Sequence, residues 1–123
     1  MLDDLLAHAR ESGPAECCGL LIGNDEWVSR SLRARNADPN ASRYLIAPED
    51  HFAAIRQART LGLSVIGAYH SHPWSPPMPS TLDVVEADDA GLLYVIIGTG
   101  VPAIRAFRIE HGNFREVALV PES

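Results

Sequence analysis

Two histidines separated by one residue, followed by a proline-rich stretch, a serine and an aspartate, have the clearest chemical potential in this chain. His70 and His72 flank Ser71, and Ser80 and Asp83 follow. On an extended backbone, residues i and i+2 point the same way, so the two imidazoles can reach one centre. With the Asp83 carboxylate they make three protein ligands and leave a fourth place for water, as in catalytic zinc sites. The spacing therefore predicts one Zn²⁺ per chain.

Hydrolysis at such a centre needs two further groups. Zinc lowers the pKa of its water toward about 7 and polarises a carbonyl. A base must take the proton of the water and pass it to the leaving amine, and an acidic residue that does not bind the metal would serve. A hydrogen-bond donor must stabilise the oxyanion, and Ser80 is close enough in sequence to offer its hydroxyl.

The same residues also fit a purely structural interpretation. Ser80 and Asp83 match a capping box, in which a serine begins a helix and an acid three residues later folds back onto it. A His-x-His pair on a strand can also be incidental. A carboxylate that binds zinc cannot also fold back to the cap, so the two roles compete for Asp83. The joint pattern of two histidines, Pro73, the serine and the aspartate favours the metal site.

Hydrophobic periodicity predicts a mixture of helices and strands around these residues. Within the second expected helix, Phe52, Ile55, Ala58 and Leu61 are interpreted as the buried face. The order follows no strict repeat, so we expect one mixed α/β domain over residues 1–123, with a mainly antiparallel or mixed sheet flanked by two or three helices. The expected helices cover residues 2–12, 48–61 and 80–90, and the expected strands cover residues 17–23, 27–35, 44–46, 64–69, 92–97, 103–110 and 114–120.

Composition narrows the class of protein. The chain has 123 residues and a formal net charge of −6, which argues against a nucleic-acid or anionic-membrane surface. The adjacent Cys17 and Cys18 are poorly placed for a disulfide and favour a reducing compartment. The first residues lack the basic region of a signal peptide, and the longest apolar run, residues 92–97, is far shorter than a membrane span of about 20 residues. We expect a cytoplasmic protein.

The motif resembles the signature of the JAMM (MPN-plus) metalloprotease family. That signature is a distant Glu, then His-Ser/Thr-His-Pro, six residues, and Ser-x-x-Asp. Here the distant Glu corresponds to Glu16, in a segment, residues 14–23, that is similar to the first strand of the family. Residues 66–69 are similar to its core strand. The likeness extends from about Leu2 to Val120 in the element order of the family.

The resemblance implies a fold, a set of roles and a substrate class. It implies a cytidine-deaminase-like α-β-α sandwich, with zinc bound by the two histidines and Asp83. Glu16 would be the general base and later the acid, and Ser80 would support the tetrahedral intermediate. The family cleaves amide bonds at the C-terminal tails of ubiquitin or ubiquitin-like proteins. This short chain is similar to the compact prokaryotic members, which process sulfur-carrier proteins ending in Gly-Gly. Ala68 departs from the bulky aromatic common in the deubiquitinases.

Two further residue types near the motif have open interpretations. Trp74 follows the histidine pair on the proline-rich loop, where it could flank an extended substrate tail or only pack the loop. The two cysteines are interpreted as small core residues. If their strand alternates, however, Cys18 shares a face with Glu16, which would bring a thiol near the metal.

Two other classes of function compete with a tail-specific isopeptidase. One is a non-catalytic binding or scaffold module of the same fold, which would lack the ligands. The other is a zinc hydrolase or deaminase of a small molecule, although the Pro-Cys-x-x-Cys ligand pair of the deaminases is absent.

Overall fold

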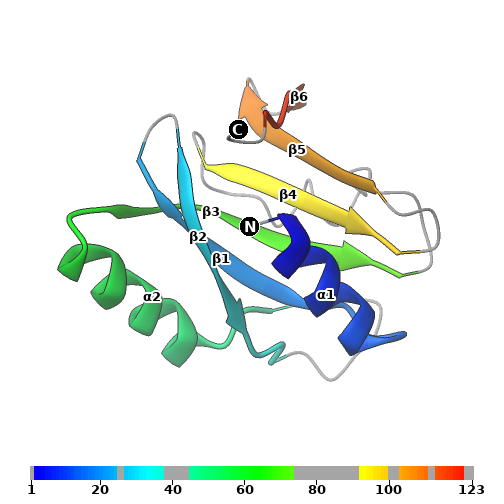
Figure 1. Ribbon diagram of the computed structural model, residues 1–123, viewed down its shortest axis with the longest axis horizontal. Helices are drawn as coiled ribbons and strands as arrows, with labels where there is room; N and C mark the ends of the chain where they lie inside the picture. The colour runs from blue at the N-terminus through cyan, green and yellow to red at the C-terminus, as the bar shows by residue number, and fades with distance from the viewer. Residues whose placement is uncertain are drawn as a thin grey trace.

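A single six-stranded sheet organises the part of the chain that the structure describes (Figure 1). The computed structural model describes residues 2–24, 27–37, 45–73, 92–99, 103–110 and 113–120. The strand order is β2-β1-β3-β4-β5-β6. The elements are α1 (Leu2–Ser12), β1 (Cys18–Gly23), β2 (Val28–Ala34), α2 (Pro48–Thr60), β3 (Ser64–His72), β4 (Leu93–Gly98), β5 (Ala103–Glu110) and β6 (Asn113–Val117).

The sheet is mixed, because β3 and β4 run parallel while every other neighbouring pair is antiparallel. The carboxyl ends of β3 and β4 therefore meet at one edge, where His72 pairs with Gly98. The antiparallel β1 begins at the same edge, where Cys18 pairs with His70. Three segments far apart in the sequence thus meet beside the histidine pair.

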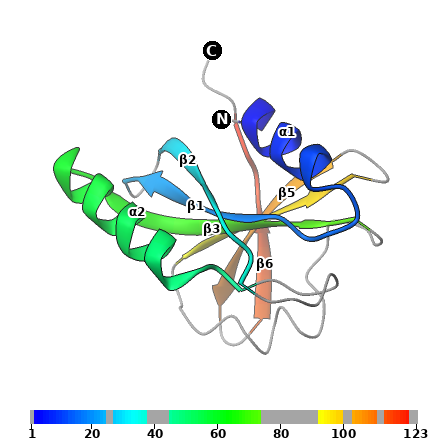
Figure 2. The ribbon, with the colours of Figure 1, turned by 90° about the horizontal axis from the view of Figure 1, so that it is seen from below.

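The two helices cover opposite faces of the sheet (Figure 2). Leu5 and Ala9 of α1 join the main core cluster, together with Leu21, Tyr69 and Val95 from three neighbouring strands. The second helix, α2, packs against β1, β2 and β3, and its Ala54 and Ala58 are buried outside that cluster. Helix, sheet and helix form three layers, which confirms the expected mixed α/β class.

The buried face expected for α2 is wrong in part. Ala54 and Ala58 are each 1% exposed, whereas Phe52 is 62% exposed and Leu61, just past the helix, is 43% exposed. A strict spacing of three residues falls behind the helical repeat by 60° at each step, so positions 52 and 61 lie half a turn apart. The buried residues of this helix are two small alanines, of which Ala58 belongs to the expected face and Ala54 does not.

Most of the other expected elements that fall on described residues agree with the structure to within three residues at each end. The strand 64–69 continues to His72, so both histidines lie on regular extended backbone. The expected helix over residues 80–90 lies outside the described residues, as does Tyr44; Ile46 forms an isolated bridge with Asn36. No helix in the described part of the chain is long and apolar enough to cross a membrane.

Gly19 lets the core tyrosine lie flat against β1. A Cβ atom at Gly19 would fall 2.2 Å from Cε1 of Tyr69 and 2.5 Å from the carbonyl oxygen of Leu32. We expect Gly19→Ala to lower the free energy of unfolding by about 3 kcal/mol, at the upper end of overpacking effects. Gly13→Ala is the matched control, since its φ of 61° is unfavourable but nothing lies within 4 Å, and it should cost only about 1–2 kcal/mol. Chemical denaturation measures both, and equal losses would contradict the steric explanation.

Candidate active site

The two histidines of the motif converge at the carboxyl end of β3. Their Nε2 atoms lie 3.1 Å apart, and their ring centroids are 5.0 Å apart. His70 is 2% exposed and His72 is 5% exposed. Since side chains alternate along a strand, both rings face away from the side on which Tyr69 and Ser71 lie. The structure therefore brings together the two imidazoles that the spacing predicted.

This geometry fits a shared metal ion. Two nitrogens bound at about 2.0–2.1 Å in a tetrahedron lie roughly 3.3 Å apart, close to the observed 3.1 Å. Among the described residues no group of three His, Cys, Asp or Glu side chains converges. The expected third ligand, Asp83, lies outside those residues, as do Ser80 and Trp74.

Glu16 lies two residues before the start of β1, whose first residue pairs with His70 of β3. Cys18 pairs with His70, and the backbone N–H of Ser71 donates to the Cys17 carbonyl at 3.1 Å, which extends the pairing by one residue. If the same register continued by one more residue, Glu16 would lie opposite His72. Glu16 itself is partly buried, and its role beside the imidazoles stays a prediction.

The peptide bond that follows Glu16 is held by side chains from two other segments. Its carbonyl oxygen accepts a hydrogen bond from Nδ2 of Asn36 at 3.0 Å. Its N–H, which belongs to Cys17, donates to Oγ of Ser71 at 2.9 Å. No motif or hydrophobic periodicity in the sequence marks Asn36.

Cys18 is a core thiol whose hydrogen bonds run away from the histidines. Its Sγ lies 3.7 Å from the carbonyl oxygen of Arg35, at the end of β2. Burial, with the nearby Cys17, Asp50 and Glu16, raises the pKa of the Cys18 thiol to about 12. The thiol is therefore protonated at neutral pH, and a metal would have to displace that proton to bind it. These contacts favour the core interpretation.

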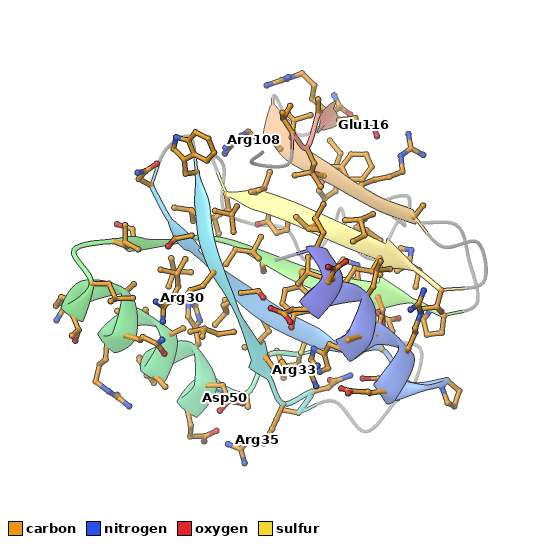
Figure 3. The ribbon with its side chains drawn as sticks, in the orientation of Figure 1. Arg30, Arg33, Arg35, Asp50, Arg108 and Glu116 are labelled. Carbon is orange, nitrogen blue, oxygen red and sulfur yellow. The ribbon has the colours of Figure 1, made fainter. Side chains whose placement is uncertain are left out.

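A hydrogen bond between α1 and β3 supports the strand from its other face. Nδ1 of His8 lies 2.7 Å from the Tyr69 hydroxyl, and the two rings meet edge to face. Burial, and then the nearby positive charge of Arg33, lower the pKa of His8, while Glu11 opposes the shift. Arg33 and Glu11 also form an ion pair between β2 and α1, and Figure 3 labels Arg33 beside α1.

The lowered pKa of His8 predicts a pH-dependent stability. Because the folded state resists protonation of His8, stability is complete above the unfolded pKa of about 6.5 and is lost as the pH falls through the lower folded pKa. We expect the free energy of unfolding to decrease less between pH 7 and pH 5 in His8→Gln than in the wild type. Urea denaturation at a series of pH values tests this, and parallel curves for the two proteins would contradict it.

Solved structures share this architecture. A protein from Desulfitobacterium hafniense, solved in solution, superposes with a TM-score of 0.87 at 32% sequence identity, over 97% of this chain and 86% of that one. A JAB1/MPN domain protein from Archaeoglobus fulgidus superposes with a TM-score of 0.63 at 20% identity, over 96% and 90% of the two chains. The second likeness shows the fold alone. The chain therefore has the three-layer fold of a JAB1/MPN domain protein.

Sequence comparison gives the family. Residues 1–110 match the family model described as prokaryotic homologs of the JAB domain, and the chain belongs to this family. A probable TtuB-protein conjugate cleaving protease of Thermus thermophilus is 37% identical, over 98% of this chain and 78% of the relative. A desampylase of Haloferax volcanii is 35% identical, over 98% and 91%. A CysO-cysteine peptidase of Mycobacterium tuberculosis is 27% identical, over 94% and 83%.

These findings confirm the expected compact prokaryotic JAMM type. They also confirm the expected class of enzyme, since the named relatives are peptidases and conjugate-cleaving proteases. The sequence motif that includes His70 and His72, with Glu16, resembles the JAMM family. The match of residues 1–110 to the family model agrees with this resemblance.

Proposed function

We propose that this protein is a zinc-dependent isopeptidase that cleaves an amide bond at the C-terminal tail of a ubiquitin-like, sulfur-carrier type protein. The observation that carries the proposal is the pair of buried Nε2 atoms of His70 and His72, 3.1 Å apart, at the edge where β1 begins. Asp83 completes the ligand set in this proposal, and one catalytic domain spans residues 1–123. The buried free cysteines suit a reducing cytoplasm.

In this proposal, different residues of the chain bind the metal, transfer protons and stabilise the developing negative charge. A zinc ion bound there supplies Lewis acidity toward the scissile carbonyl and lowers the pKa of a water molecule. Glu16 accepts a proton from that water and returns it to the leaving amine, which therefore departs neutral. Ser80 donates a hydrogen bond to the oxygen on which negative charge develops. The two imidazoles must be neutral to bind the metal, so activity declines at acidic pH.

The names of the relatives support the substrate class. They refer to TtuB-protein conjugates, to desampylation and to a CysO–cysteine bond. We assign to this chain a partner with a Gly-Gly tail, because a tail without side chains can approach the buried histidine pair closely. Trp74, which directly follows Pro73 in the sequence, would flank that tail. The chain contains arginine but no lysine, so it offers no lysine ε-amine of its own as an acceptor for such a conjugate.

The two competing functions are less well supported. A scaffold module needs no buried histidine pair, yet the structure has one. The pairing of Cys18 with His70 supports a place for Glu16 at the same edge. A hydrolase of a small molecule would not explain why the relatives are named for protein conjugates.

Cleavage of defined substrates tests the proposal. The purified protein, loaded with one equivalent of Zn²⁺, is incubated with a ubiquitin-like carrier that bears either a single residue or a lysine-linked protein after Gly-Gly. Intact-mass analysis should show loss of the adduct from at least one substrate, and Glu16→Ala should show none. No cleavage of either substrate by the zinc-loaded wild type would refute the proposed function.

A further inference from the structure

We propose that Ser71 and Asn36 are positioning residues that hold the Glu16 backbone in register with the two histidines. This proposal rests on the proposed role of Glu16 as the general base. Neither residue has a role in the zinc chemistry described above. Ser71 lies between the two histidines in the sequence, and Asn36 follows β2.

Both residues bind the same peptide group. The carbonyl of Glu16 and the N–H of Cys17 form the two polar ends of one planar peptide unit. Asn36 Nδ2 donates to the carbonyl at 3.0 Å, and Ser71 Oγ accepts from the N–H at 2.9 Å. A peptide bonded at both ends cannot rotate without breaking a hydrogen bond. The two side chains therefore fix the direction in which the chain leaves Glu16.

The hydroxyl of Ser71 takes the place of a backbone acceptor. In a regular antiparallel pair, two opposed residues exchange two N–H to carbonyl bonds. Between Cys17 and Ser71 the bond from Ser71 N–H to the Cys17 carbonyl is present at 3.1 Å. The return bond from Cys17 N–H runs instead to the serine hydroxyl. The hydrogen bond from the Cys17 N–H to β3 therefore needs the hydroxyl group of Ser71. For this reason the pairing of the two segments at Cys17 depends on the residue type at position 71.

Ser71 cannot act on the substrate directly. It is fully buried, and its side chain lies on the opposite face of β3 from His70 and His72 because side chains alternate. Its backbone, however, joins the two histidines. Ser71 therefore connects β3, which carries the two imidazoles, with the peptide group between Glu16 and Cys17.

Asn36 is itself held in place, so its amide has a defined orientation. Its Oδ1 accepts from the N–H of Leu45 at 3.0 Å, and its backbone forms a bridge with Ile46. The preceding residue, Arg35, donates its N–H to Oδ2 of Asp50 in the first turn of α2 at 2.7 Å, and both are labelled in Figure 3. This end of β2 is therefore fixed to α2.

A general base that moves by a fraction of a hydrogen-bond length is no longer aligned with the proton that it must accept. Such a displacement lowers kcat, and it changes the affinity for the substrate much less. We expect Ser71→Ala and Asn36→Asp each to lower kcat about 10- to 100-fold, the range for residues that orient groups at a metal centre. Zinc content and KM should stay within about twofold of the wild type. Asn36→Asp is the sharper variant, since it keeps an acceptor for Leu45 but presents an oxygen to the Glu16 carbonyl.

Asn24→Asp is the matched control. Asn24 also bonds a backbone group, the N–H of Trp27 at 3.1 Å, but it lies beyond the far end of β1. This variant should leave kcat unchanged. A loss equal to that of Asn36→Asp would mean that any disturbance of β1 lowers activity, and it would overturn the proposal.

Combination with Glu16→Gln separates positioning from other effects. If the two residues act through Glu16, Ser71→Ala and Asn36→Asp should cause no further loss in a Glu16→Gln background. A full additional loss, or a loss of zinc, would overturn the proposal. Full activity of Ser71→Ala and Asn36→Asp beside an inactive Glu16→Gln would refute the positioning role alone. An active Glu16→Gln would refute the proposed function and this inference with it.

Amide hydrogen exchange gives a readout that needs neither substrate nor metal. In the metal-free protein, Ser71→Ala should increase the exchange rate of the Cys17 N–H at least about tenfold, because the amide loses its acceptor. Neighbouring amides of β3 should keep their protection, which also shows that the variant folds. An unchanged Cys17 exchange rate would contradict the hydrogen bond on which the inference depends.

Discussion

Glu16→Gln should lower kcat by about 10²- to 10⁴-fold while the protein keeps its zinc. The amide has nearly the same shape as the carboxylate but cannot accept a proton, so only the general-base step is lost. Glu16 is expected opposite His72 but outside the metal ligand set, so removal of its charge should not release the ion. Zinc content by mass spectrometry and initial rates with the cleavable carrier substrate measure the two effects separately.

A matched glutamate on the surface controls for the charge change. Glu11 is exposed and pairs with Arg33 on the other face of the sheet. Glu11→Gln should alter kcat less than twofold, since exposed ion pairs contribute about 0–1 kcal/mol to stability. If Glu16→Gln lost zinc to the same degree as a ligand variant, Glu16 would have to be reassigned to the metal ligands.

The convergence of the two histidines was predictable from the sequence because its signal is local. His70 and His72 are two positions apart, and a strand fixes their relative direction wherever the strand lies. The convergence of their Nε2 atoms to 3.1 Å needs no long-range contact. The apolar runs that became β1, β3 and β4 are short and continuous, as expected for strands buried on both faces.

The place of Glu16 depended on strand pairing, which the residues alone do not specify. Nothing within residues 14–23 reveals that β1 lies antiparallel to β3 with Cys18 opposite His70. Only the resemblance to a known family pointed to Glu16. Asn36 was missed for the same reason, since its amide acts on a residue 20 positions away and leaves no periodic pattern. Contacts between segments are decided by tertiary packing, which hydrophobic periodicity does not report.

The opposite error, on α2, came from a preference for large side chains. Phe52 carries more apolar area than any alanine, so size suggested that it was buried, yet it is 62% exposed. The helix residues that lie against the sheet are Ala58, which the expected face includes, and Ala54, which it omits. Small residues allow a helix to approach closely, and this close approach keeps the first turn of α2 within hydrogen-bonding distance of Arg35, beside Asn36.

His70→Ala should remove zinc binding and, with it, all measurable hydrolysis. Binding of a structural zinc ion by four ligands corresponds to about 10–16 kcal/mol, or roughly 3 kcal/mol for each ligand, so the loss of one imidazole lowers affinity at least about 100-fold. A chelator should abolish the activity of the wild type in the same way, and added Zn²⁺ should restore the wild type but not the variant. Competition with a zinc-binding dye gives the affinities.

His51→Ala provides the control for a histidine outside the site, because His51 is exposed on α2. It should bind zinc and cleave substrate at wild-type rates. Asp83→Ala is expected to match His70→Ala, which would identify the third ligand without any further structural information. If His70→Ala bound zinc as tightly as His51→Ala does, the two imidazoles would be neighbours without being ligands. Their 3.1 Å separation would then reflect only a hydrogen bond between the rings.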